Sequence, residues 1–387
     1  MNKTVYLDYQ ASKPIDPEVL DAMKPYFFEN FANSSSLHHD GDTATQALEE
    51  SRKKIANFIN AEDPSEIIFT SGATESNNLA IIGYAMRNKR KGKHIIISEV
   101  EHISIHNICK FLQRNGFEIS KIPVDFYGVI RLDKLKEKIR EDTILISVQY
   151  ANNEIGTVQP IKEISKIARE HDIAFHSDAV AAEGLLPIDV VNDQIDLLTL
   201  SSNDIYGPRG LGILYVQKRI RVNPIIIGGG QERGLRSGTE DIASIVGMAK
   251  AAEIVQKNMA TENKRLEAMR DDLISKILEK VPKSYLNGHP KHRLPNNAHF
   301  RFDYIEGESL LLSLKDENIS IATGSACTSR TLQASHTLIS LGLLHEEAHG
   351  SLQVTLGRYT TQEDIDRFVD ALPPIVERLR KLSPLAE

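Results

Sequence analysis

Five segments of this 387-residue sequence carry side chains or backbone groups suited to ligand binding, and each follows a short apolar run. The segments are Ser71–Glu75, Glu101–His102, Asn152–Gly156, Asp178 and Ser201–Asp204. An apolar run that ends in polar or small residues is typical of a buried strand leading to a site. The carboxyl ends of parallel strands face one crevice, so we expect the five segments to meet around one ligand.

The first segment, Ser71–Glu75, has the properties of a phosphate-binding turn. Its small residues precede a helix-compatible stretch at 76–86. A helix N-terminus presents free backbone N–H groups and a favourable dipole to an anion. The same residues are equally compatible with an ordinary helix N-cap formed by Ser71 or Thr74.

The next segments supply groups that suit an aromatic cofactor. His102 can stack on a flat ring, although a single histidine at a strand end is more often structural. Asn152–Gly156 is either a turn that donates to a ligand oxygen or a plain asparagine-rich turn. Asp178 offers the carboxylate that a pyridinium nitrogen needs as its partner. A phosphate turn, a stacking ring, an oxygen donor and an acid together suit pyridoxal phosphate.

The elements that must position these groups alternate along the middle of the chain. Charged amphipathic stretches at 132–141 and 161–171 predict helices. Runs rich in Ile, Leu and Val predict buried strands at 66–70, 94–98, 143–148, 173–178 and 196–201. This alternation predicts an α/β fold in which a large, doubly wound, mostly parallel sheet has helices on both faces.

A long charged helix at about 242–281 is expected to lead to a smaller α+β region. We predict a large ligand-binding domain of residues 15–255. A small α+β domain would consist of residues 1–14 and 256–387 and would carry Cys327 and Arg358.

Composition narrows the possible functions. Hydrophobic residues make up 41% of the chain and charged residues 26%, as in a soluble globular protein. A net charge of −7 argues against nucleic-acid binding, and no apolar run is long enough to span a membrane. The first residues lack a signal-peptide segment, so a cytoplasmic location is expected. The two cysteines, Cys109 and Cys327, do not suggest a disulfide framework.

Several motifs together resemble the cysteine desulfurases of the NifS/IscS group, within the class V aminotransferase family. The motifs run in order from Tyr6 to Asp366 and include YLDYQASKPIDPEV, FTSGATESNNLAI, ANNEIGTVQPI, GGGQERGLRSGTE, TGSACTS and LGRYTTQEDID. The resemblance implies an aspartate-aminotransferase-like fold, pyridoxal phosphate as cofactor, and a homodimer with the site at its interface. It also implies conversion of L-cysteine to alanine and a protein persulfide, whose sulfur passes to an IscU-like iron–sulfur scaffold protein.

The resemblance also implies roles for individual residues. Phosphate contacts would come from Ala73, Thr74, Ser201 and, across the dimer, Thr239. His102 would stack on the cofactor ring, Asn153 would donate to its phenolate oxygen, and Asp178 would pair with its nitrogen. Arg358, with Asn33 nearby, would clamp the substrate carboxylate, since a guanidinium pairs with it bidentately. Cys327 would be the catalytic cysteine, whereas Cys109 is predicted to be a packed core residue.

The sequence departs from the family pattern at the predicted cofactor anchor. Where the family reads Ser-Gly-His-Lys, this chain reads Ser201-Ser202-Asn203-Asp204, so Asp204 stands at the Schiff-base lysine position. Asn203 stands at a phosphate-contacting histidine and is still counted as a cofactor-binding candidate. There are two further departures. Asp178-Ala179-Val180-Ala181 stands where the family reads DATQ, and residues 8–13, DYQASK, stand where the family reads DNAATT. An archaeal branch of the group has a similar SSNDIYGP segment.

Loss of the lysine changes the chemistry that is expected. Aspartate cannot form an imine, and as an anion it opposes a phosphorylated cofactor unless it is protonated or turned away. The cofactor is therefore expected to be bound non-covalently or to have been lost. Asp204 could keep only part of the lysine's acid–base work, and His102 is the other catalytic candidate of the pocket.

We favour a desulfurase homologue that acts in iron–sulfur cluster assembly with little or no desulfurase activity. Cys327 would carry sulfur or, with Asp204 as a further metal ligand, bind a [2Fe–2S] cluster shared with the scaffold. The sulfur would come from L-cysteine or from sulfide. The alternatives are an active cysteine desulfurase with non-covalent pyridoxal phosphate and, third, an enzyme for another substrate such as selenocysteine.

Overall fold

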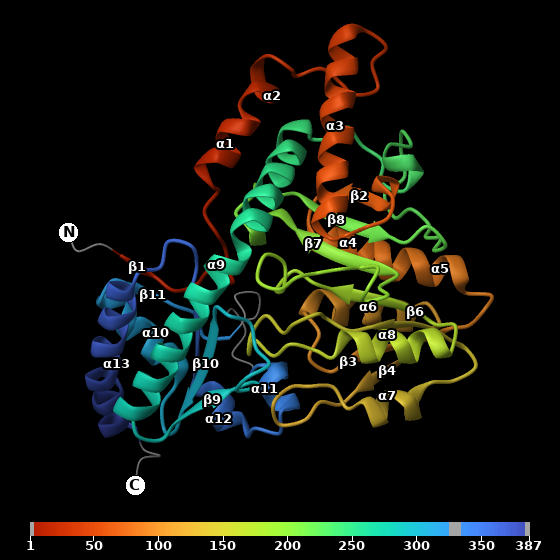
Figure 1. Cartoon of the computed structure of the whole chain (residues 1–387). Coiled ribbons are helices and arrows are strands. Elements are labelled where there is room, and N and C mark those ends of the chain that lie inside the picture. The colour runs from red at the N-terminus through yellow and green to blue at the C-terminus, as the bar shows by residue number, and fades with distance from the viewer. Residues whose placement is uncertain (1–3, 325–333, 384–387) are drawn as a thin grey trace.

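The structure is a computed structural model that describes residues 4–324 and 334–383 (Figure 1). Its larger sheet has the strand order β2-β8-β7-β6-β5-β3-β4. The strands are β2 (Ile67–Thr70), β3 (His94–Ser98), β4 (Glu118–Ile122), β5 (Thr143–Ser147), β6 (Ala174–Asp178), β7 (Leu197–Ser201) and β8 (Gly212–Val216). The pairs from β7 through β4 are parallel, and β8 is antiparallel to both of its neighbours. The prediction of a mostly parallel sheet is confirmed.

Helices cover both faces of this sheet, as predicted. They include α3 (His39–Phe58), α4 (Ala73–Asn78), α5 (Tyr84–Asn88), α6 (Ile103–Arg114), α7 (Leu132–Lys138) and α8 (Ile161–Glu170). Successive residues of β2 point to opposite faces of the sheet and contact helices on each. Ile67 and Phe69 join the buried cluster that contains α3, α7 and α8, whereas Ile68 joins the cluster of α5 and α6 on the opposite face.

The smaller part of the molecule lies beyond the long helix α9 (Ile242–Lys280), which crosses the molecule diagonally in Figure 1. A three-stranded antiparallel sheet, β12-β10-β9, and a short parallel pair, β1-β11, form its β-structure. These strands are β1 (Val5–Tyr6), β9 (Ser284–Asn287), β10 (Asn297–Phe302), β11 (Ile319–Ser320) and β12 (Ser351–Thr355). Its helices are α10 (Gly307–Asp316), α11 (His336–Ser340), α12 (His345–His349) and α13 (Gln362–Leu382).

The N-terminal residues join the two parts. After β1, the chain continues into α1 (Pro17–Met23) and α2 (Pro25–Phe28), which pack against α9 (Figure 1). The boundary predicted at residue 255 falls inside the continuous helix α9, and the division into two domains stays a prediction. Within residues 4–324 and 334–383, no helix has both the length and the apolar character needed to cross a membrane.

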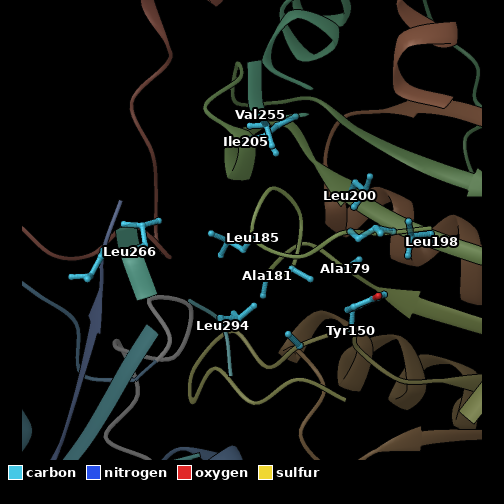
Figure 2. Close-up of a cluster of buried hydrophobic side chains, with 14 of the residues drawn as sticks. Tyr150, Ala179, Ala181, Leu185, Leu198, Leu200, Ile205, Val255, Leu266 and Leu294 are labelled. Atoms are coloured by element: carbon cyan, nitrogen blue, oxygen red, sulfur yellow. The ribbon is translucent and has the colours of Figure 1, made fainter. Parts of the chain in front are cut away.

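Apolar side chains fill the region where the two parts meet, beneath the ends of β6 and β7 (Figure 2). Val255 and Leu266 of α9 contribute to the same buried cluster as Leu185 and Ile205 of the larger part. Leu294, from the segment before β10, joins them. Because this core is continuous, it fixes the segments after β6 and β7 relative to the smaller part.

Candidate active site

A cavity of about 170 Å³ lies at the carboxyl ends of the parallel strands. Because β8 is antiparallel to both β2 and β7, β2 has the same direction as the parallel strands and ends at the same edge. All five segments singled out from the sequence reach this cavity, and the predicted residues on its wall are Ala73, Thr74, His102, Asn153, Asp178, Asn203 and Asp204.

The turn after β2 is built as a helix start with open backbone groups. Gly72, with φ of 141°, is the N-cap of α4 and makes no side-chain capping bond, so the alternative of an N-cap by Ser71 or Thr74 is wrong. Glu75 accepts from the backbone N–H of Ser71 at 2.7 Å, which steadies the turn. A Cβ atom at Gly212 of β8 would lie 2.8 Å from the backbone of Gly72, so β8 requires glycine to pass this closely. The turn suits an anion of the size of a phosphate.

Asp178 ends β6 with its carboxylate on the cavity wall. Its Oδ2 atom accepts from Asn77 Nδ2 at 2.8 Å, and its Oδ1 atom accepts from the backbone N–H of Val180 at 3.1 Å. These bonds hold the carboxylate in a fixed orientation. The arrangement can therefore pair with a protonated ring nitrogen.

His102 is held in place by its position as the N-cap of α6. Its Nδ1 atom accepts from the backbone N–H of Ser104 at 3.2 Å, and the Ser104 hydroxyl lies 2.8 Å from the same atom. The adjacent Glu101 is completely buried, and its carboxylate accepts from Ser98 Oγ and from the backbone N–H of Gln149. Burial raises the pKa of Glu101 to about 8. The ring of His102 is thus held by Ser104, and the residue before it is anchored by a buried carboxyl group.

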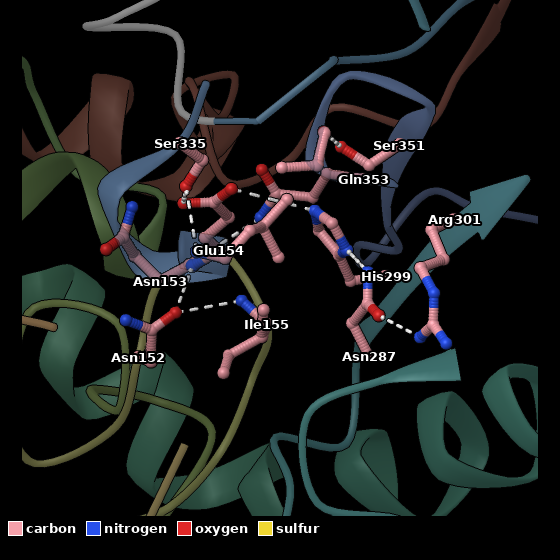
Figure 3. Close-up of polar contacts among 12 residues, drawn as sticks. Asn152, Asn153, Glu154, Ile155, Asn287, His299, Arg301, Ser335, Ser351 and Gln353 are labelled. Carbon is pink, nitrogen blue, oxygen red and sulfur yellow. Dashed lines mark hydrogen bonds and ion pairs between the residues drawn. The ribbon is translucent and has the colours of Figure 1, made fainter. Parts of the chain in front are cut away.

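The turn that carries Asn153 is fixed from both sides (Figure 3). Asn152 Oδ1 accepts from the backbone N–H groups of Glu154 and Ile155 at 2.9 and 2.8 Å. From β12, Gln353 Nε2 donates to the backbone oxygen of Asn153 at 2.6 Å. Asn153 is therefore positioned jointly by the larger sheet and the smaller one.

Asp204 lies in the short 3₁₀ turn Ser202–Ile205 after β7 and is only 7% exposed. Burial raises the pKa of its carboxyl group above the usual value. Asn203 beside it accepts from Ser12 Oγ at 3.3 Å, so the N-terminal segment closes this side of the cavity.

Four predicted residues do not line the cavity. Ser201 is half-buried, and its backbone N–H donates to Glu183. Asn33 and Thr239 are both exposed, and a hydrogen bond of 2.9 Å between their neighbours Ser34 and Glu240 holds them close together.

Arg358 is the fourth, and its position differs most from the expectation. Its Nη1 atom pairs with Asp16 and its Nε atom lies 3.3 Å from Glu262, so the guanidinium already has two carboxylate partners. It also lies over the ring of Tyr206, 4.4 Å from the ring centre. The predicted catalytic Cys327 falls outside the residues that the structure describes.

Sequence reasoning missed several residues of the cavity wall. They are Asp8, Gln10, Ala11, Asn77, Ser104, Gln149, Ala151, Val180, Ala181 and Gln353. Asn77 lies on the helix that follows the phosphate-type turn, one helical turn beyond Ala73. This spacing places both residues on the same face of the helix, so Asn77 could have been predicted to face the cavity. Gln353 comes from a distant strand and left no local signal.

No group of three or more His, Cys, Asp or Glu side chains within residues 4–324 and 334–383 is placed to hold a metal ion. Of the two predicted metal ligands, Asp204 belongs to the described part of the chain and Cys327 does not. The role of either residue as a ligand to iron remains a prediction.

Comparison with known proteins defines the family. Residues 5–368 match the family described as Aminotransferase class-V. The chain is 57% identical over 380 residues to "Cysteine desulfurase IscS 1" of Archaeoglobus fulgidus, covering 98% of this chain and 99% of the relative. It is 50% identical over 384 residues to "Cysteine desulfurase IscS" of Methanosarcina thermophila, covering 99% and 95%.

Solved structures agree. A "NifS-like protein" superimposes with a TM-score of 0.91 at 32% identity, covering 97% of this chain and all of the other. A structure described as "SspA in complex with cysteine" gives 0.82 at 37% identity, covering 92% and 100%. The fold is thus that of a pyridoxal-phosphate-dependent transferase of fold type I. The chain belongs to the class-V aminotransferase family and, within it, to the IscS-like cysteine desulfurases.

Proposed function

We propose that this protein acts in iron–sulfur cluster assembly as an IscS-like homodimer whose own desulfurase activity is weak or absent. Its cavity holds pyridoxal phosphate without a covalent link. Cys327 carries sulfur to an IscU-like scaffold protein, or it ligates the nascent [2Fe–2S] cluster on that scaffold. Sulfur that Cys327 carries as a persulfide comes from L-cysteine, with alanine as the co-product. Sulfide, where it is the source, enters the cluster directly, and Cys327 then acts only as a ligand. A cytoplasmic location suits this role.

The cavity wall fits the cofactor of the family. The backbone N–H groups at Ala73 and Thr74 suit its phosphate, His102 suits its ring, Asn153 its phenolate oxygen and Asp178 its ring nitrogen. When bound, pyridoxal phosphate supplies an electron sink for bond cleavage in an amino acid. The residues of this chain bind and orient it.

The observation that carries the proposal is the buried carboxylate of Asp204 on the wall of this cavity. No lysine is among the described residues that line it, so none there offers an amine for a covalent link to an aldehyde. Asp204 takes the position at which the family has its lysine. The rest of the binding apparatus is retained, and this favours binding of the cofactor without efficient turnover.

Thr239 and Asn33 fit the dimer that this function requires. Both are exposed, their sequence neighbours Ser34 and Glu240 are hydrogen-bonded to each other, and neither residue lines the cavity of its own protomer. An exposed pair of this kind is suited to complete the site of a second copy, with Thr239 contacting the phosphate there and Asn33 the substrate.

The role of Cys327 is tested by cluster assembly with a scaffold protein, iron and supplied sulfide. We expect Cys327→Ala to abolish or strongly reduce the cluster bound to the complex, because a thiolate ligand is lost. Cys109→Ala is the matched control, since Cys109 is buried and burial raises the pKa of its thiol to about 12. A cluster of normal yield and spectrum on the Cys327→Ala complex would show that this cysteine is not a ligand.

A further inference from the structure

Lys13 brings a buried amine to residue 204 from a distant part of the sequence. It lies between β1 and α1 and is 7% exposed. Its Nζ atom donates a hydrogen bond to the backbone oxygen of Asp204 and lies 5.4 Å from the centre of the Tyr206 ring. The lysine that is missing at position 204 is therefore matched by a lysine that reaches the same place from position 13.

The amine approaches Asp204 from behind the cofactor cavity. Asp204 lines both that cavity and a second one of about 20 Å³. Lys13 lines the second cavity, together with Glu183 and Arg358, and does not line the first. The position of the ammonium group suits electrostatic action on the pocket through Asp204.

The second cavity gathers acids that need a positive neighbour. Glu183 is 1% exposed, its Oε1 atom accepts from the backbone N–H of Ser201 at 3.0 Å, and its Oε2 atom has no hydrogen-bond partner within the described structure. Burial raises the pKa of Glu183 well above its usual value, and the nearby Asp204 adds to the shift. Burial also lowers the pKa of Lys13, and Asp204 opposes that change.

An ammonium or carboxylate group buried alone is strongly unfavourable, whereas two of opposite charge compensate each other. Lys13 and Asp204 are both positions at which this sequence departs from the family pattern. Each replacement alone would bury a charge without the partner that the other replacement supplies. Together they move the buried amine from position 204 to position 13 and place a carboxylate at position 204.

We propose that the Lys13 ammonium group is the counter-charge of the Asp204 carboxylate. It offsets this negative charge on the cavity wall, so that an anionic ligand binds there. Lys13 is thus a positioning residue that acts through Asp204. The ligand half of this inference rests on the proposed binding of pyridoxal phosphate. The pairing of the two residues does not.

The test is a double-mutant cycle with Lys13→Met, Asp204→Asn and the double variant. Two quantities are measured for each full-length protein: the dissociation constant of pyridoxal phosphate, and the urea midpoint of unfolding without ligand. Lys54→Met is the matched control, because Lys54 is exposed and pairs with the exposed Glu253 at 3.1 Å.

We expect Lys13→Met to weaken pyridoxal phosphate binding on the order of tenfold, because it leaves Asp204 uncompensated. Asp204→Asn should bind at least as tightly as the native protein, and the double variant should return close to the native constant. Each single variant should lower the urea midpoint. The double variant should lower it by less than the sum of the two single-variant shifts. A lysine with a merely structural role would not be rescued by Asp204→Asn.

Additive urea shifts, or a double variant that binds as weakly as Lys13→Met, would overturn the pairing. So would borohydride reduction that couples the cofactor to Lys13, since Lys13 would then be the reacting amine. If the native protein binds no pyridoxal phosphate, the cofactor part of the proposed function and the ligand half of this inference both fail. The unfolding cycle still decides the pairing in that case.

Discussion

Glu154 and His299 lie side by side in the core, with 3.8 Å between Oε1 and Nε2, and neither atom has a hydrogen-bond partner in the described structure (Figure 3). Arg301 donates to Asn287 Oδ1 at 2.9 Å, so the Asn287 amide group donates to His299 Nδ1 at 3.0 Å. A neutral His299 therefore carries its proton on Nε2, which faces Glu154. The other carboxylate oxygen accepts from Ser335 Oγ at 2.7 Å, close to the end of the undescribed segment 325–333.

Stability should fall with rising pH because of Glu154. Burial raises the pKa of Glu154 to about 7, so the folded state binds this proton more tightly than the unfolded state. Its stabilising effect is present at low pH and is lost as pH rises through about 7. Glu154→Gln should remove about 2 kcal/mol of the decrease between pH 5 and 8, as measured by urea unfolding at each pH. Parallel pH profiles for the variant and the native protein would contradict this.

Asp178→Asn should weaken pyridoxal phosphate binding at least tenfold, which is about 1.4 kcal/mol. The variant loses the negative charge for the ring nitrogen and turns an amide N–H₂ toward one of the two donors, Asn77 or Val180. Equilibrium dialysis measures the affinity. Asp133→Asn, in an exposed pair with Arg131, is the control. Equal affinities for the Asp178 variant and this control would exclude the assigned role.

Arg358→Ala should lower the free energy of unfolding by about 2–3 kcal/mol even without substrate, because it leaves Asp16 and Glu262 unpaired. Urea unfolding with and without L-cysteine separates this structural effect from substrate binding. An unchanged free energy of unfolding would mean that the guanidinium is not committed to these carboxylates and is free to clamp a substrate.

Cys109 should resist alkylation in the native protein. The residue is 3% exposed, and burial raises the pKa of its thiol to about 12, so it has little thiolate at neutral pH. After brief treatment with iodoacetamide, mass spectrometry should find one modified cysteine, Cys327, and two after denaturation. Rapid modification of Cys109 in the folded protein would contradict its assignment as a core residue.

The strands and their exits could be predicted because the signals are local. Buried parallel strands are continuous apolar runs, and those at 66–70, 94–98, 143–148, 173–178 and 196–201 agree with the structure to within one residue at each end. β8 was missed because it follows β7 without an intervening α-helix, which breaks the expected alternation. β4 was missed because it is a partly exposed edge strand.

Contacts between distant parts of the sequence could not be predicted. Lys13 meets Asp204 across 191 positions, and Arg358 meets Asp16 across 342. Neither contact leaves a periodic pattern, because it depends on how the N-terminal segment returns to the core. The resemblance assigned Arg358 a substrate role, but only the structure shows the two carboxylates that already hold it.

The most direct test of the proposed function is sulfide release from L-cysteine, with pyridoxal phosphate and reductant supplied, by the native protein beside Asp204→Lys and Asp204→Lys combined with Lys13→Met. We predict little or no release by the native protein and turnover in the double variant, in which the lysine returns without a second ammonium group behind it. Enzyme-like sulfide release by the native protein would contradict the account and favour an active desulfurase that does without the lysine.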